Sequence, residues 1–544
     1  MAKNKDNNEV VGISEIMETF GIYQKMQYFY CCLSVLFVTM ITINYVFVAG
    51  EINYRCQVPE CDGSNPVYSA TWWPNATLDR CYKPILNHTV TSGSCTNNSF
   101  TSHVEKCSSW VYESNDTIVA ELDLACQPWK AGLVGTVHNI GMLIAMLLGG
   151  WLCDRFGRKP TTVICAVGSV IGILKIFASS YYPFIALELL EAAISGGIYT
   201  SAMVLMIEIT GTKARVLPGV LFAYSNYLGE AVYACIAMLM PYWQHLVMII
   251  CLPNVLFLSF IYIVRESPRW QIINGRIDEA KETLLIIAKT NKVNVNKDIL
   301  ASTNEDTLKE AFNIETNEKK EGFSDIIKSR EIMKRVSVSV VVKFGTGFIY
   351  YGLVMNSVGL PGDKYWNFFM SAAASFPGEL IAMYLMNKIG RKKPLIYGYL
   401  TCGILNILCA VTPDSNTWLK IVIFLLGKMV MSACFTGMVT YSMELFPTSV
   451  RGSLCGFITF AACLGSVLAP LTPMLAITFA PLPFIIFGCS ATVAGLLIIL
   501  TPETKDQPLL DTLEQINASS SKNRRECTAN DNPAYIDDDS SNKF

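Results

Sequence analysis

The amino-acid sequence predicts an all-α membrane protein with twelve transmembrane helices, arranged as two six-helix halves with a disulfide-rich extracellular loop. Three observations lead to this prediction. Hydrophobic residues make up 52% of the 544 positions and charged residues only 16%, whereas soluble domains carry about 25% charged residues. Apolar runs close to the ~20 residues that cross a bilayer recur along the chain. Charged motifs at the ends of these runs return in the same order in the second half of the sequence.

The apolar runs define the transmembrane helices and the segments between them. We expect helices over residues 28–49, 129–152, 161–179, 182–208, 217–240, 245–263, 336–358, 365–386, 394–411, 418–443, 453–477 and 482–500. They divide the chain into a cytoplasmic segment 1–27, an N-terminal half 28–263 with an extracellular part 50–128, a cytoplasmic helical linker 264–335, a C-terminal half 336–500 and a disordered tail 501–544. Because the first 27 residues show no cleavage site after a short apolar core, the first span is expected to direct its own insertion.

Basic residues in the short loops predict the orientation of the chain. The loops rich in Lys and Arg fall on one side of the membrane, and they contain Arg155, Arg158, Lys159, Lys213, Arg215, Lys388, Arg391, Lys392, Lys393 and Arg451. The opposite short loops hold little beyond Lys364 and Lys420. Because Lys and Arg collect on the cytoplasmic side, both termini are expected inside the cell and residues 50–128 outside.

The segment 50–128 has the composition of an exported domain. Its six cysteines are Cys56, Cys61, Cys81, Cys95, Cys107 and Cys126. An even number of cysteines in a short exported segment predicts disulfides, and six cysteines allow 15 pairings. The segment also contains four N-x-[ST] glycosylation sequons, at Asn75, Asn87, Asn97 and Asn115. Both features support the extracellular assignment independently of the basic loops.

Charged markers repeat between the two halves of the sequence. The motif GGWLCDRFGRKP at 149–160 has a weaker copy, MNKIGRKKP, at 386–394. Three markers recur at offsets of 233 to 237 residues, and they match Asp154 with Asn387, Glu208 and Arg215 with Glu444 and Arg451, and Glu266 with Glu503. The chain is therefore expected to contain two homologous halves in parallel orientation. This is the repeat of major facilitator transporters, whose halves rock around a site near the bilayer midplane.

The charges at the cytoplasmic helix ends are interpreted as an inner gate. A carboxylate–guanidinium contact at a dry helix end can hold such a gate closed. Since Asn387 replaces Asp154 in the second half, the second contact is expected to be weaker. The alternative is that these loops only set topology, which leaves the recurring acids unexplained. The gate candidates are Asp154, Arg155, Arg158, Glu208, Arg215, Arg391, Glu444 and Arg451.

Several short motifs follow one another in a fixed order. They are ISEIMETFGIYQKMQ at 13–27, GGWLCDRFGRKP at 149–160, ESPRW at 266–270, YYGL at 350–353, LLGK at 425–428, MELFPTSVRG at 443–452 and PETK at 502–505. Together with the cysteine-rich loop, they resemble the organic cation, anion and carnitine transporter family of the major facilitator superfamily. The sugar-porter branch is similar, but its members lack so large a first loop. The resemblance implies a plasma-membrane carrier of a small organic solute, without a cofactor or metal.

Charges inside the predicted spans are candidates for function, because a charge at the bilayer centre costs a few kcal/mol. They are Lys175, Glu188, Glu191, Glu230, Lys343, Glu379 and Lys428. Two sets could form ion pairs at matching depth, Lys343 with Glu379, and Lys175 with Glu188 and Glu191. Glu230 lies near the midplane, with Asn226 one turn below it on the same helical face. It is the candidate ligand for a substrate ammonium group, and Lys428 is its main rival partner.

Ring faces can replace part of the hydration shell of an organic cation through cation–π attraction. The resemblance assigns this role to the seventh and tenth spans, where the matching residues are Tyr350, Tyr351 and Phe435, and Phe376 is a further candidate. The sequence also departs from the family. Cys463 stands where cation carriers have Asp and anion carriers have Arg, Lys343 replaces a cavity tryptophan, Ser375 a carboxylate, and Glu188 an arginine. One acid and one or two bases suit an amine or a zwitterion, and a lone anion is the alternative.

Other classes of function find less support. The sequence shows no metal-ligand spacing, nucleophile–His pair or phosphate-binding loop, so neither an enzyme nor an ATP-driven pump is expected. The net charge of −2 indicates no nucleic-acid partner. A non-transporting receptor remains an alternative because Cys463 is neutral. Proton coupling through Glu230 or Glu191, exchange and uniport all stay open. The tail motif NPAY at 532–535 resembles an internalisation signal read by a cytoplasmic adaptor.

Overall fold

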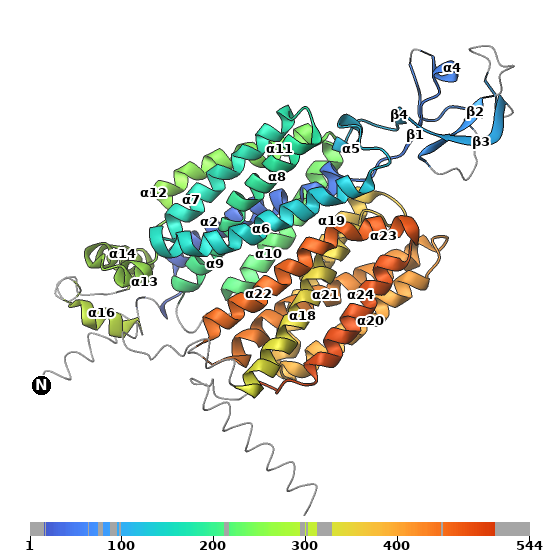
Figure 1. Cartoon of the computed structure of the whole chain (residues 1–544). Coiled ribbons are helices and arrows are strands. Elements are labelled where there is room, and N and C mark those ends of the chain that lie inside the picture. The colour runs from blue at the N-terminus through green and yellow to red at the C-terminus, as the bar shows by residue number, and fades with distance from the viewer. Residues whose placement is uncertain are drawn as a thin grey trace, which may run out of the picture. The chain divides into compact units, whose positions relative to one another are not determined.

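The long apolar segments of the sequence form helices (Figure 1). The computed structural model describes residues 16, 18–63, 65–73, 80–86, 95–96, 99–210, 217–293, 300, 303–312, 329–447 and 450–505. Within these residues, ten helices are long and apolar enough to cross a membrane, at Ile22–Val48, Pro128–Phe156, Arg158–Phe177, Tyr181–Glu208, Trp243–Ile263, Arg330–Asn356, Lys364–Lys388, Lys392–Val411, Thr417–Leu445 and Arg451–Thr478. Helices α10 (Leu217–Leu239) and α24 (Leu482–Ile498) occupy the two other predicted spans. The protein is therefore a multi-pass membrane protein, consistent with twelve helices.

Several spans are built from consecutive helical pieces. In the first half these are α2 (Ile22–Ile43) with α3 (Tyr45–Val48), α7 (Arg158–Gly168) with η2 (Ser169–Phe177), α8 (Tyr181–Ser195) with α9 (Gly197–Glu208), and α11 (Trp243–Cys251) with η4 (Leu252–Ser259) and α12 (Phe260–Ile263); α6 (Pro128–Phe156) is continuous. In the second half they are α22 (Arg451–Leu468) with η5 (Ala469–Leu471) and α23 (Thr472–Thr478); α18 (Arg330–Asn356), α19 (Lys364–Lys388), α20 (Lys392–Val411) and α21 (Thr417–Leu445) are continuous. The η segments are 3₁₀ turns, which are common at functional breaks in helices.

The chain forms two compact units whose boundaries differ from the predicted halves. Unit 1 contains residues 1–314 together with 354–373 and 467–483, and unit 2 contains residues 315–353, 374–466 and 484–544. Two short segments of the predicted second half thus pack with the first half. Within unit 1, Asn356 Nδ2 donates to Thr472 Oγ1 at 2.8 Å, and the ring of Tyr365 stacks on Phe47 with 5.1 Å between centroids. These contacts explain why the two segments belong to unit 1.

The first helix begins six residues earlier than the sequence predicts, because the linker caps it. The Asn291 side chain accepts the backbone N–H of Tyr23 at 3.0 Å and donates to Gln24 Oε1 at 2.8 Å. Linker helices α13 (Pro268–Ile273), α14 (Ile277–Asn291) and α16 (Glu305–Ala311) bury an apolar core with Ile16 and Tyr23. Ser267 accepts the backbone N–H of Trp270 as the N-cap of α13.

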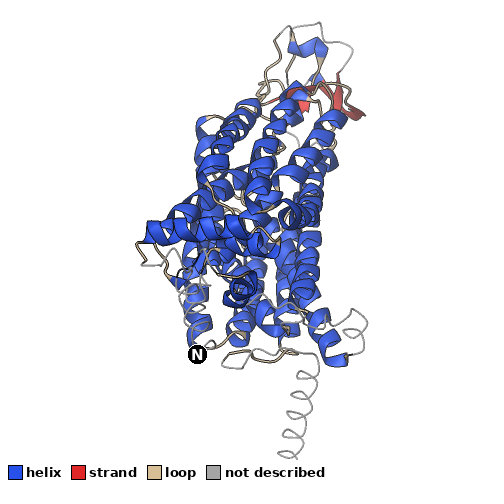
Figure 2. Cartoon of the chain, turned by 90° about the vertical axis from the view of Figure 1, so that its left-hand side faces the viewer, coloured by secondary structure: helices blue, strands red, loops and turns tan. Residues whose placement is uncertain are grey.

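The segment 50–128 folds around disulfides and short strands, and the strands are red in Figure 2. Strand β1 (Tyr54–Cys56) pairs antiparallel with β4 (Trp110–Tyr112), and β2 (Tyr82–Leu86) pairs antiparallel with β3 (Phe100–Lys106); the short helices α4 (Pro59–Asp62) and α5 (Ile118–Glu121) complete the segment. The predicted disulfides are confirmed, and their pairing is Cys56–Cys107, Cys61–Cys95 and Cys81–Cys126. Asn115 is exposed, whereas Asn75, Asn87 and Asn97 lie outside the described residues.

Candidate functional site

A charged clamp lies in the first half, where α6 passes into α7. The Arg158 guanidinium donates to both oxygens of Glu208, at 3.0 and 2.9 Å, and to the Cys153 carbonyl at 2.7 Å. The two paired side chains are only 8% and 11% exposed. Behind them, the Glu266 carboxylate accepts the backbone N–H groups of Arg158 and Lys159, at 3.0 and 3.2 Å. A bidentate pair and a carboxylate on a helix N-terminus are both favourable arrangements.

The second half repeats this clamp between α19 and α20. The Arg391 guanidinium donates to Glu444 at 3.2 Å and to the Met386 carbonyl at 2.6 Å. Glu503 accepts the backbone N–H groups of Arg391 and Lys392, at 2.8 and 3.1 Å. The preceding glycine has a positive φ in both halves, 105° at Gly157 and 125° at Gly390, which an L side chain rarely adopts. A Cβ at either glycine would also approach the carboxylate within 3.0 Å.

The two carboxylates that accept the backbone N–H groups of the clamps differ in the direction of their pKa shifts. Burial raises the pKa of Glu266, even though three backbone N–H groups oppose this change. Burial also acts on Glu503, but N–H groups of Arg391, Lys505, Lys392 and Thr504 hold its pKa below the ordinary value. Because Glu266 is the more deeply buried of the two, its charged form is the less favoured.

The other predicted gate residues contribute less to these clamps. Asp154 is 81% exposed and forms an ion pair with Arg158 at 3.4 Å. Arg155 extends over the rings of Trp151 and Phe156 on its own helix. Arg451 donates to the Phe446 carbonyl at 3.3 Å, so Glu444 pairs with Arg391 and not with the arginine that follows it by seven residues. Arg215 lies outside the described residues.

Glu230 and Asn226 lie on one face of α10 in unit 1. Glu230 is 5% exposed, close enough to Tyr45 and Tyr199 for electrostatic interaction. The Asn226 carbonyl oxygen accepts the Thr39 hydroxyl at 2.8 Å, and Tyr199 contacts the same hydroxyl at 3.0 Å. A buried carboxylate therefore stands one turn above a hydroxyl and amide network that joins α2, α9 and α10.

The candidate aromatic residues of unit 2 gather around two lysines. Lys428 Nζ lies 3.5 Å from the centroid of the Tyr350 ring, and Lys343 Nζ lies 5.7 Å from that of Phe435. The Tyr350 and Phe435 rings are 4.9 Å apart. Tyr351 adjoins Tyr350 at 5.4 Å. Two of the rings that were predicted to bind a substrate cation are thus in contact with lysine ammonium groups of the chain itself.

The last two candidate residues lie on α19 and α22. Phe376 is half-buried on α19, one residue before the helix-interior Pro377. Cys463 is half-buried on α22, close enough to Lys343 for electrostatic interaction. The backbone carbonyl of Cys463 accepts the Ser466 hydroxyl at 2.7 Å.

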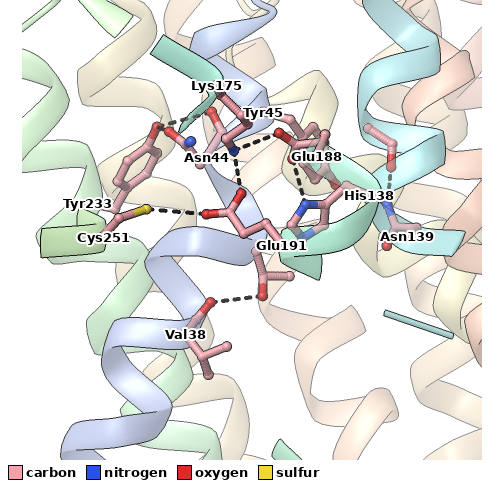
Figure 3. A network of polar contacts seen from close by, with 12 residues as sticks. Val38, Asn44, Tyr45, His138, Asn139, Lys175, Glu188, Glu191, Tyr233 and Cys251 are labelled. Carbon is pink, nitrogen blue, oxygen red and sulfur yellow. Dashed lines mark hydrogen bonds and ion pairs between the residues drawn. The ribbon is translucent and has the colours of Figure 1, made fainter. Parts of the chain in front are cut away.

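Unit 1 also contains a cluster of buried charged side chains, apart from Glu230, that has more members than the sequence predicts (Figure 3). The expected pairing of Lys175 with Glu188 and Glu191 is confirmed, with a distance of 2.7 Å from Lys175 to Glu188. His138 of α6 joins it, because its Nδ1 lies 2.7 Å from Glu188 Oε1. The Cys251 thiol donates to Glu191 at 3.2 Å. The members predicted from the sequence do not include His138. Its position inside the predicted span 129–152 could have indicated that it belongs to this cluster.

Comparison with known proteins shows which families and structures the chain resembles. The chain matches the profile of the Sugar (and other) transporter family over residues 87–517. It is 32% identical to Organic cation/carnitine transporter 4 of Arabidopsis thaliana, covering 77% of this chain and 80% of that protein. It is 30% identical to human Solute carrier family 22 member 2, covering 75% and 73%. The inward open structure of the Escherichia coli xylose transporter XylE superposes with a TM-score of 0.54 at 16% identity, covering 94% of this chain and 99% of XylE, which shows the major facilitator fold.

Proposed function

Because the chain belongs to the sugar (and other) transporter family and, within it, to solute carrier family 22, we propose that it carries small organic cations or zwitterions across the plasma membrane by alternating access. Amines, quaternary ammonium compounds and carnitine-like compounds are the expected solutes. The names of the relatives support this class, since they include organic cation and organic cation/carnitine transporters. Both termini are placed in the cytoplasm on the basis of the basic loops.

The observation that carries the proposal is the buried carboxylate of Glu230. A carboxylate that is 5% exposed inside a membrane span is energetically costly. Its presence there therefore indicates a function. The amide of Asn226 and the hydroxyls of Thr39 and Tyr199 give its surroundings polar groups that can orient a small solute. An ammonium group of a substrate would neutralise the Glu230 charge in this environment.

The lysines of unit 2 supply charge of the opposite sign. Lys343 is 5% exposed and Lys428 is fully buried, each beside an aromatic ring. Within unit 2, these ammonium groups are candidates to bind a carboxylate of a solute. They also favour the second candidate function, transport or exchange of an organic anion, in which Glu230 takes no part.

The two clamps are proposed to act as cytoplasmic gate elements. Each clamp joins helices of its own half, Arg158 with Glu208 and Arg391 with Glu444. A clamp of this kind keeps the ends of its helices together while the helices move as one body. The proposed adaptor motif at 532–535 lies outside the described residues.

Uptake into cells tests the proposal directly. The solutes are tetraethylammonium, a carnitine-like zwitterion, a small organic anion and a hexose, each with and without membrane depolarisation. We expect cation or zwitterion uptake that Glu230→Gln lowers by about tenfold or more. Glu279→Gln, which changes an exposed linker carboxylate, is the matched control. Surface expression is measured for each variant.

Each other outcome indicates a different class of protein. Uptake of the anion alone, unchanged by Glu230→Gln and lost in Lys343→Met, would replace the cation proposal with the anion carrier. Hexose uptake alone would indicate a sugar facilitator. Ligand binding without uptake of any solute would indicate a receptor.

A further inference from the structure

The buried group of His138, Lys175, Glu188 and Glu191 has no role in the proposed solute site, although it lies in the same unit as Glu230. These four side chains come from α6, η2 and α8, and each is 2% exposed or less. Lys175 bridges the two carboxylates, and His138 contacts only one of them, Glu188. We name these four residues the buried quartet (Figure 3).

The charges of the buried quartet do not balance without an added proton. Two carboxylates and one ammonium leave one negative charge if the imidazole is neutral. His138 Nε2 is buried and has no hydrogen-bond partner among the described residues. A protonated ring would leave that N–H unsatisfied, which is costly in the interior. The neutral tautomer with a proton on Nδ1, donated to Glu188, therefore fits the contacts.

The surrounding elements supply no further cation in the described part of the chain. The groups that face the buried quartet are the phenol of Tyr45 on α3, the phenol of Tyr233 on α10 and the thiol of Cys251 on α11. Phenols and thiols are neutral at physiological pH. A net negative charge at full burial is strongly unfavourable, so one carboxyl group must hold a proton for part of the cycle.

Glu191 is the carboxyl group best placed to hold this proton. Glu188 receives two strong donors, His138 Nδ1–H and the Lys175 ammonium, which favour its charged form. Glu191 shares the same ammonium, and within the described residues its other oxygen receives only a thiol, which is a weak donor. The backbone is closely fitted to this carboxyl group, since a Cβ at Gly172 would overlap Glu191 Oε1.

Tyr45 links this group to the proposed solute site. It is close enough to both Glu188 and Glu230 for electrostatic interaction. The Tyr45 ring also lies 5.4 Å from the ring of His138. In a medium of low dielectric constant, a cation bound at Glu230 and a proton added to the buried quartet repel each other. Binding of one therefore favours release of the other.

We propose that the buried quartet binds one exchangeable proton, mainly on Glu191, and that the carrier exchanges this proton for an organic cation. The inference rests on the proposed function, because it assigns the coupling ion to that transport activity. In each cycle the Glu191 carboxyl group releases one proton to the side from which one monovalent cation binds, and it takes up a proton again on the side to which the cation is released. The cycle is then electroneutral.

Proteoliposomes with purified full-length protein test the exchange. The solute is tetraethylammonium, whose charge does not depend on pH, and the membrane potential is clamped at zero with potassium and valinomycin. An acidic interior should drive accumulation of about tenfold per pH unit at equilibrium. Glu191→Gln, which mimics the protonated carboxyl group, should carry tetraethylammonium down its own gradient but not respond to pH. Wild-type uptake that ignores the pH gradient would overturn the proposal.

Infrared difference spectroscopy tests the proton site without any transported solute. The wild-type protein should show the C=O stretch of a buried carboxylic acid that titrates with pH. This band should be absent from Glu191→Gln and retained in Glu279→Gln. Equal spectra for wild-type protein and Glu191→Gln would refute the proton site. If the band is present and tetraethylammonium is not transported, the proposed function fails and the proton site stands.

Discussion

Glu266 and Arg158 are joined through the backbone rather than through their charges. The Glu266 carboxylate accepts the N–H of Arg158 at 3.0 Å, which leaves the Arg158 guanidinium to hold Glu208. Glu503 and Arg391 are joined in the same way at 2.8 Å. The repeated charged motifs thus preserve a backbone contact as well as an ion pair. They still differ in burial, and this difference has measurable consequences.

The first prediction concerns the pH dependence of the two clamps. The pKa of Glu266 is raised by burial, so its contribution to stability is present below the unfolded pKa and is lost as pH rises through the folded pKa. The pKa of Glu503 is lowered, so its contribution is present above the unfolded pKa and is lost as pH falls through the folded pKa. The Tm of wild-type protein minus that of Glu266→Gln should fall as pH rises from about 4 upward. For Glu503→Gln the same difference should fall on acidification, and parallel trends would contradict the assignment.

The second prediction compares the two ion pairs. Glu208→Gln should destabilise the protein by about 1–3 kcal/mol, because it removes a charged acceptor from a largely buried guanidinium. Glu444→Gln should cost less, since Arg391 and Glu444 are 20% and 24% exposed and solvent already screens them. Thermal unfolding in nanodiscs measures both variants. A larger loss for Glu444→Gln would reverse the order that we expect from burial.

The third prediction concerns the ring that covers Lys428. Tyr350→Leu should lower uptake by about tenfold, because the buried ammonium loses the ring face 3.5 Å away. Tyr350→Phe keeps the ring face and should retain most of the activity. Uptake is compared at equal surface expression. Equal losses in both variants would assign the effect to the hydroxyl group and not to the ring.

The fourth prediction concerns the disulfides of the segment 50–128. The double substitution Cys56→Ser with Cys107→Ser opens a closed loop with a sequence separation of 51 residues, which should cost the segment about 2–5 kcal/mol. We expect reduced delivery of the protein to the cell surface. The free cysteine Cys235, exposed on α10, provides a control in Cys235→Ser. Normal surface levels in the double variant would show that the remaining two disulfides suffice.

The fifth prediction tests the side of the membrane on which this segment lies. Asn115 is exposed and begins a glycosylation sequon. If the segment is extracellular, Asn115→Gln should increase electrophoretic mobility by the loss of one glycan, and glycosidase treatment should remove the difference. Identical mobility before treatment would mean that Asn115 is not glycosylated.

Much of the helical architecture could be predicted from composition and spacing. Apolar length places the helices, because a bilayer imposes that length on every span. The start of the first helix at Ile22 could not be predicted, since it depends on a side chain far away in the linker, Asn291. The membership of residues 354–373 and 467–483 in unit 1 could not be predicted either, because it depends on packing between segments that are far apart in the sequence.

Some contacts of the charged residues could likewise be predicted from the sequence, and others could not. The Lys175 pairings follow from matching depth along neighbouring helices, so the sequence indicates them. The partner of Glu444 depends on loop geometry, so the spacing of seven residues between Glu444 and Arg451 does not indicate that Glu444 pairs with Arg391. Asp154 and Arg155 both have the right chemistry for a clamp, but Asp154 is largely exposed and Arg155 lies over aromatic rings of its own helix.

The segment 50–128 is attached to the rest of unit 1 by more than its two ends. Glu121 accepts the indole N–H of Trp243 at 2.6 Å, and the Trp243 backbone N–H donates to the Asp116 carbonyl at 3.0 Å. Trp243 is the first residue of α11, and Cys251, the last residue of that helix, donates to Glu191. One helix, α11, therefore contacts the segment 50–128 at its first residue and the Glu191 carboxyl group at its last. We expect that a ligand which displaces the segment 50–128 would also disturb the surroundings of Glu191.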